Sequence, residues 1–152
     1  MRAAALLPPT PATSRLQDVA RWLLGAALLF AGTTHLTTAR QEFQAQVPSW
    51  FPVDSDVVVV VSGVAEIGLG LGLLLLARPK VLVGIVTAGF FVAVFPGNIA
   101  QYVEGTDAFG LDSDRARLVR LFFQPLLVLW ALWSTGALRA LREAATGRRP
   151  SA

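Results

Sequence analysis

The sequence predicts an all-α integral membrane protein, a bundle of four transmembrane helices with both termini on the cytoplasmic side. Of its 152 residues, 54% are hydrophobic and only 15% are charged. The apolar residues form four long blocks, each close to the roughly 20 residues that cross a hydrocarbon core about 30 Å thick. Most cations fall in segments that an even number of spans places on one side. Together these observations make lipid the expected solvent.

Each apolar block predicts one transmembrane helix. The spans are expected at residues 17–36, 57–77, 81–102 and 117–135, within a transmembrane domain at 16–136. The third block contains Pro96-Gly97 near its end, where we expect a kink or an early stop because proline removes a helical hydrogen bond. The loop at residues 37–56 contains Trp50 and Phe51, which suit the headgroup level. We therefore expect this loop to be a membrane-hugging lid or a re-entrant turn.

The two ends of the chain are predicted to be cytoplasmic tails. Residues 1–15 contain Pro8, Pro9 and Pro11, which is typical of a flexible segment. A cleavable signal peptide is the alternative for this end, but the residues after the first apolar run lack a small-x-small cleavage site. Residues 137–152 form a basic tail and predict a short amphipathic helix on the inner surface, held partly by anionic lipid.

The distribution of cations predicts the orientation. Nine lysines and arginines share the side of the two termini: Arg2, Arg15, Arg21, Arg78, Lys80, Arg139, Arg142, Arg148 and Arg149. The opposite side has four: Arg40, Arg115, Arg117 and Arg120. Cytoplasmic segments of membrane proteins carry the excess of lysine and arginine. We therefore expect a multi-pass protein of the plasma (inner) membrane with both termini inside.

The residue inventory excludes several kinds of chemistry. The absence of cysteine rules out disulfides, CxxC exchange and thiolate metal sites. With a single histidine, a bis-histidine haem or a histidine-rich metal centre would need more than one chain. We expect no metal and no covalent cofactor. The net charge of +3 is modest and does not indicate nucleic acid; the expected partners are membrane lipids, with a membrane-protein partner or a second copy as open alternatives.

Glu66 is the most informative polar residue. It lies nine positions into the second block, about 14 Å below the surface at the helical rise. An acidic side chain at such a depth costs on the order of 3 kcal/mol, so we expect it to face the bundle and to be paired or protonated. Gly63, Glu66 and Gly70 share one helical face with little bulk. That face is either a cavity wall or a surface where helices approach closely. In the second case Gly68-xxx-Gly72 would also allow a close helix contact.

Five further polar residues belong to the same outer half. In the fourth block Arg117, Arg120 and Gln124 follow i, i+3, i+7 spacing and share a face. Arg120 either snorkels to the headgroups or turns inward to meet Glu66. Asn98 and Gln101 follow the Pro96-Gly97 break, where freed backbone groups need partners.

His35 ends the first block on the same side. We take Glu66 and His35 as the candidate catalytic pair. The candidate ligand-binding residues are Asn98, Gln101, Arg117, Arg120 and Gln124. A purely structural role, as a buried network or an interface histidine, is the alternative for each of them.

Several segments together resemble the DoxX-like family of bacterial four-helix membrane proteins, over residues 21–135. The matching pieces are His35, Phe43, Val47-Pro48, the stretch 62–68 (SGVAEIG), the stretch 95–99 (FPGNI) and the stretch 117–124 (RLVRLFFQ). The resemblance implies a left-handed four-helix bundle in a bacterial inner membrane. Its members include proteins linked to thiosulfate and quinone oxidoreduction, subunits of oxidative-stress complexes and assembly factors. This chain lacks the cysteines that some redox relatives use.

Three functions follow as hypotheses. The first is a small subunit of a membrane redox complex that binds quinone in the outer half, with His35 and Glu66 handling protons while Arg120 and Gln124 hold carbonyl oxygens. The second is a non-enzymatic scaffold or assembly factor, in which the polar residues fix helix register. The third is a cofactor-free lipid or isoprenoid isomerase or cyclase with Glu66 and His35 as acid and base.

Overall fold

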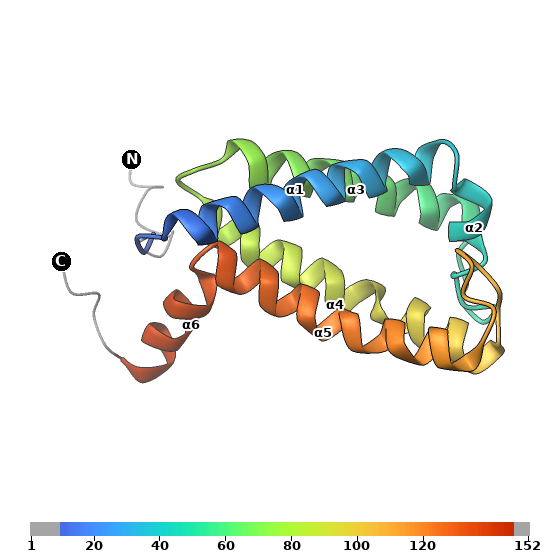
Figure 1. Ribbon diagram of the computed structural model, residues 1–152. Helices are drawn as coiled ribbons and strands as arrows, with labels where there is room; N and C mark the ends of the chain where they lie inside the picture. Colours follow the sequence, from blue (N-terminus) through green and yellow to red (C-terminus); the bar gives the residue numbers. More distant parts are fainter. Residues whose placement is uncertain (1–9, 148–152) are drawn as a thin grey trace.

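The computed structural model describes residues 10–147, whose secondary structure is helical with no strand among them (Figure 1). The helices are α1 (Arg15–Leu36), α2 (Arg40–Gln44), α3 (Ser55–Leu75), α4 (Lys80–Glu104), α5 (Asp114–Ser134) and α6 (Ala137–Thr146). Four of them, α1, α3, α4 and α5, are long enough and apolar enough to cross a membrane. The predicted tails lie partly outside the described residues, at 1–9 and 148–152.

Polar caps explain where the long helices begin. Ser14 and Gln17 form a capping box at the start of α1. The Asp54 side chain accepts from two backbone N–H groups at the start of α3, and Ser113 caps α5 in the same way. These caps start α3 and α5 two and three residues earlier than the hydrophobic blocks predict, because the capping side chain rather than the first apolar residue sets the boundary.

The expected early stop at Pro96 is wrong. α4 continues through Pro96 to Glu104 and ends at Gly105, whose φ of 66° is left-handed. Proline removes one backbone donor, and the helix can continue where neighbouring groups bond to the carbonyls around the break. Here Gln124 of α5 donates to the Phe91 carbonyl, one turn before the proline, at 2.6 Å. α5 likewise passes through Pro125 without ending.

The long helices form two close pairs, α1 with α3 and α4 with α5 (Figure 1). In the first pair the backbones touch: a Cβ added to Gly32 would lie 2.6 Å from the Gly63 carbonyl oxygen, and one added to Gly70 would lie 2.7 Å from that of Gly25. The small face of α3 is therefore a helix contact. Gly68 has nothing within 4 Å, so the Gly68-xxx-Gly72 spacing does not make this contact.

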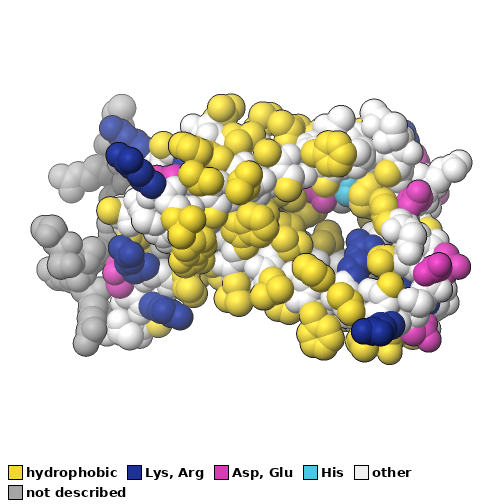
Figure 2. Space-filling view, in the orientation of Figure 1, with side chains coloured by type: hydrophobic (Ala, Val, Ile, Leu, Met, Phe, Trp, Pro, Cys, Tyr) yellow, Lys and Arg dark blue, Asp and Glu magenta, His cyan; other side chains and the backbone are white. Residues whose placement is uncertain are grey.

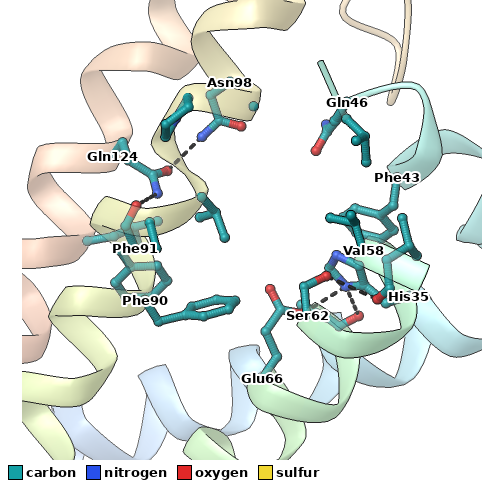
Figure 3. Close-up of a pocket in the computed structure, with 18 of the residues that line it drawn as sticks. His35, Phe43, Gln46, Val58, Ser62, Glu66, Phe90, Phe91, Asn98 and Gln124 are labelled. Carbon is teal, nitrogen blue, oxygen red and sulfur yellow. Dashed lines mark hydrogen bonds and ion pairs between the residues drawn. The ribbon is translucent and has the colours of Figure 1, made fainter. Parts of the chain in front are cut away.

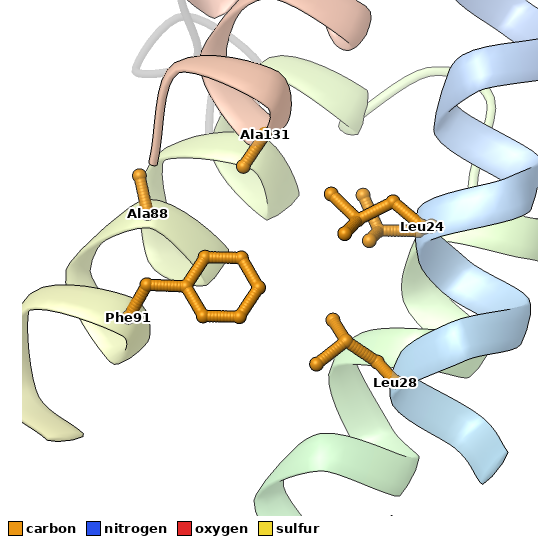
Figure 4. Close-up of a cluster of buried hydrophobic side chains, with 6 residues drawn as sticks. Leu24, Leu28, Ala88, Phe91 and Ala131 are labelled. Atoms are coloured by element: carbon orange, nitrogen blue, oxygen red, sulfur yellow. The ribbon is translucent and has the colours of Figure 1, made fainter. Parts of the chain in front are cut away.

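A hydrophobic cluster joins the two pairs near α6 (Figure 4). Its buried members are Leu24, Leu28, Leu73, Ala88, Phe91 and Ala131. Trp130 of α5 adds a hydrogen bond from its indole nitrogen to the Ala20 carbonyl of α1, at 2.8 Å. We call the part of the molecule near α6 the α6 end and the opposite part, which contains α2, the α2 end. Figure 2 shows a broad hydrophobic band between two charged ends.

Candidate functional site

A cavity of about 480 Å³ separates the two helix pairs toward the α2 end. All four long helices and the segment around α2 line it (Figure 3). Most of the wall is apolar, with Leu28, Phe90, Phe91 and Leu127 among the lining residues. In the face that Figure 2 shows, the surface is hollowed between the pairs, and charged side chains are visible there. The volume is within the range of small-molecule sites, which are apolar with a few placed polar groups.

On the α1–α3 side of the cavity Glu66 lies against His35. Glu66 Oε2 is 2.7 Å from His35 Nδ1, and both side chains are nearly buried, with 12% and 8% exposed. The same nitrogen lies 2.9 Å from the Ala31 carbonyl, and in the tautomer with its proton on Nδ1 it donates to that oxygen. Oε2 accepts no well-directed hydrogen bond within residues 10–147. The expected partner of Glu66, Arg120, is thus replaced by His35, because α1 is the helix that packs beside α3.

On the α4–α5 side two amides face this pair across the cavity (Figure 3). Asn98 Nδ2 donates to Gln124 Oε1 at 2.9 Å, and Gln124 Nε2 donates to the Phe91 carbonyl. The Gln124 amide is therefore fixed by a donor and an acceptor. Asn98 Oδ1 has no hydrogen bond in the described part of the chain, so this buried residue keeps an acceptor for an occupant.

Arg120 stands at the α2 end of the cavity. Its two terminal nitrogens donate to Gln101 Oε1 at 2.9 Å and to Gln46 Oε1 at 3.2 Å. Its guanidinium carbon lies 5.6 Å from the centre of the Phe109 ring. Arg120 thus neither snorkels free nor meets Glu66; amide oxygens from α4 and from the segment after α2 hold it beside the cavity.

The segment after α1 closes this end of the cavity. The Phe43 ring stacks on His35 with centres 3.3 Å apart, and Phe109 packs against Phe43 at 4.6 Å. Glu42 accepts from the Phe109 backbone N–H at 2.6 Å. Asp56 accepts two hydrogen bonds from Arg40. The hydrogen bonding to Asp56 and the negative charge of its carboxylate raise the pKa of the Arg40 guanidinium. Residues 43–51 of the predicted lid at 37–56 therefore contribute to the wall of the cavity at this end.

Five of the seven residues predicted from sequence line the cavity: His35, Glu66, Asn98, Arg120 and Gln124. Gln101 and Arg117 are buried but do not line it. Gln101 accepts from Arg120 and so positions it. Arg117 pairs with Asp107 and Asp114 and donates to the Thr106 carbonyl, which anchors the loop between α4 and α5. Helical spacing places Arg117 and Arg120 on one face but does not say that the cavity ends between them.

Sequence reasoning missed Gln46 and Phe109 as parts of this site. Gln46 lies in an irregular stretch of the first loop, where no periodicity assigns a direction to a side chain. Phe109 has a φ of 55°, which is uncommon for a residue with a side chain. Neither feature is visible in the sequence. Within residues 10–147 no group of three or more histidine or acidic side chains is placed to hold a metal ion.

Residues 24–135 match the model of a family described as a domain of unknown function, DUF8561. The chain belongs to the DUF8561 family. The matched segment runs from Leu24 to Thr135 and contains every residue that lines the cavity. No curated protein and no solved structure matches the chain. The likeness to the DoxX-like family stays a prediction.

Proposed function

We propose that this DUF8561 protein crosses a bacterial inner membrane four times as a helical bundle with both termini in the cytoplasm. The cations support this orientation. Arg15, Arg78, Lys80, Arg139 and Arg142 all belong to the α6 end, where α1 begins and α6 lies. Acidic residues gather at the α2 end, which the positive-inside rule assigns to the outer side. In this orientation the cavity opens within the outer half of the bilayer.

We propose further that the cavity binds a lipid-soluble molecule with a carbonyl-bearing head, of the quinone class, and that the chain is a small subunit of a membrane redox complex. One observation supports this most: three separate sets of polar side chains face one apolar cavity. These sets are the Glu66–His35 contact, the Asn98–Gln124 amide pair and Arg120. A flat ring with oxygens at opposite edges needs donors on opposite walls of an apolar slot.

The residues present fit such a head. Arg120 supplies N–H donors toward a carbonyl oxygen, and the Asn98 amide offers its second N–H as a donor and its open Oδ1 as an acceptor. The buried Glu66 Oε2 accepts no well-directed hydrogen bond in the described chain, so this carboxylate and the adjacent His35 imidazole can hold a proton at the cavity wall. A bound quinone supplies electron and proton uptake at its two oxygens. The protein itself orients the head, keeps the tail among apolar side chains and controls the nearest proton.

Binding in reconstituted protein tests this proposal. The protein in nanodiscs is titrated with a short-chain quinone, and binding is read by quenching of its tryptophans. We expect saturable binding that Glu66→Gln weakens. Arg115→Gln, an exposed arginine of α5 away from the cavity, is the matched control and should bind as wild type. Saturable binding that Glu66→Gln leaves unchanged, or no binding at all, would contradict the proposal.

A second function is favoured by the carboxylate–imidazole contact itself. A carboxylate 2.7 Å from a histidine at the wall of an apolar cavity can serve as acid and base on an isoprenoid or lipid substrate without a cofactor. We propose such an isomerase or cyclase as the alternative. The lipid and isoprenoid profiles of a deletion strain and its parent test it, and identical profiles would count against it. If the polar residues only fix helix register, Glu66→Gln should lower the stability of the protein, and the wild-type protein should bind no ligand.

A further inference from the structure

We propose that Arg120 binds an oxyanion, so that the occupant of the cavity is a lipid-soluble acid rather than a neutral molecule. This inference deepens the proposed function, since it names the charge of the head that the cavity accepts. It rests on the partners of Arg120, on the donors that these partners leave open and on the place of Glu66. None of these observations depends on the redox chemistry of the occupant.

Arg120 differs from the other arginines that form side-chain networks at the α2 end. Arg40 pairs with Asp56 at 2.5 Å, and Arg117 pairs with Asp114 at 2.7 Å and with Asp107. Within residues 10–147, Arg120 has no acidic partner, and the oxygens that it contacts belong to neutral glutamine amides. Of these three arginines, Arg120 is therefore the one without a carboxylate partner in the described chain, and it is also the one that lines the cavity.

The open donors of Arg120 suit a carboxylate or phosphate. A guanidinium presents five N–H donors in a planar fork and binds such groups through two parallel hydrogen bonds. Two hydrogen bonds of Arg120 are made, one to Gln101 and one to Gln46. These bonds come from two segments, α4 and the segment after α2, and the two glutamines also hydrogen-bond to each other at 3.4 Å, which holds the fork in place. The remaining donors are free to meet a head group in the cavity.

The surroundings make an anion favourable at this place. A charge in an apolar region costs free energy unless an opposite charge is close, and an acidic head would offset that cost. Glu66, the acid among the residues that line the cavity, lies against His35 instead. The apolar lining from Leu24, Leu28 and Phe91 extends from this level toward the α6 end and would take an alkyl or isoprenoid tail.

Three kinds of membrane amphiphile share this chemistry: an ionised hydroxyquinone, a fatty acid and an alkyl phosphate. The decisive experiment compares two naphthoquinones that have the same alkyl tail. One has a 2-hydroxyl group, which is ionised at neutral pH, and the other has a 2-methoxy group, which is neutral. Both are titrated into the wild-type protein in nanodiscs. We expect the hydroxyquinone to bind roughly 10- to 100-fold more tightly, as a charge-assisted hydrogen bond allows.

Variants connect this preference to Arg120. Arg120→Gln should bind the two quinones with similar affinity, and Arg120→Lys should keep part of the preference because the charge remains. Arg115→Gln, on the same helix and exposed, should keep all of it. If Arg120→Gln does not fold, the wild-type ratio and Arg120→Lys decide the question. Equal affinities in the wild-type protein, or a preference that persists in folded Arg120→Gln, would overturn the inference.

A fatty acid and an alkyl phosphate of the same tail length identify the source of the oxyanion. Binding of either acid without binding of any quinone would support the role of Arg120 and contradict the quinone proposal. Equal binding of both quinones would support the quinone proposal and contradict the role of Arg120 in binding an oxyanion. Absence of binding by all four compounds would overturn both.

Discussion

The two helix pairs are held together by different means. Backbone contact joins α1 and α3, through Gly32 with Gly63 and Gly25 with Gly70. Side-chain hydrogen bonds join α4 and α5 toward the α2 end, where Asn98 and Gln124 supply one of them. Glycine contacts bring helices close but leave no polar group for a ligand, whereas amides and guanidinium groups hold helices and still offer donors. The difference explains why most of the ligand-facing donors come from the second pair.

The Glu66–His35 contact is the exception in the first pair, and removing His35 should have the largest effect. His35→Ala leaves a nearly buried carboxylate without its neighbour, so we expect a loss of about 3–5 kcal/mol in the free energy of unfolding. Denaturation in mixed micelles measures it. His35→Ala/Glu66→Gln should recover at least half of the loss, because the charge is gone. A double variant as unstable as the single one would contradict the role of this contact.

Gly32→Ala tests the backbone contact. The added Cβ would meet the Gly63 carbonyl at 2.6 Å and the Ile67 backbone nitrogen at 2.9 Å, neither of which can rotate away. We expect a loss of about 3 kcal/mol, at the upper end of overpacking costs. Gly68→Ala is the matched control, since nothing lies within 4 Å there, and should be neutral or stabilising by up to about 1 kcal/mol. Equal losses in the two variants would show that close approach is not what the glycines provide.

Asn98→Ala tests the polar contact of the second pair. It removes the donor to Gln124 Oε1, and we expect a loss of about 1–2 kcal/mol in unfolding free energy because a buried acceptor stays unsatisfied. Asn98→Leu/Gln124→Leu should recover part of the loss, since both side-chain amides are then absent while the Phe91 carbonyl loses its donor, but should weaken quinone binding. A double variant that binds quinone as wild type would remove the amide pair from the proposed site.

Arg40→Gln should have the smallest effect. Its ion pair with Asp56 is about two-fifths exposed on both sides, and exposed pairs contribute little to stability. We expect unchanged unfolding and unchanged quinone affinity in the assays above. A clear loss of affinity would mean that the position of α2, and not only the ring of Phe43 on His35, governs the cavity.

Much of the site could be predicted from the sequence because polar residues within apolar blocks are costly and so face inward. That argument found Glu66, Asn98 and Gln124, all of which line the cavity. It failed for the partner of Glu66. Helical spacing gives the direction of a side chain relative to its own helix, but not which helix lies opposite. Gln46 was missed because the loop that contains it has no periodicity.

The sequence by itself determined four long apolar helices, since the composition and length of each block depend on local residues alone. It also determined that the polar residues belong to one end. Only the tertiary structure decided that α1 lies against α3, that His35 therefore meets Glu66, and that Arg120 keeps free donors beside a cavity. These outcomes depend on which helices pack together, and that choice results from contacts between residues far apart in the chain.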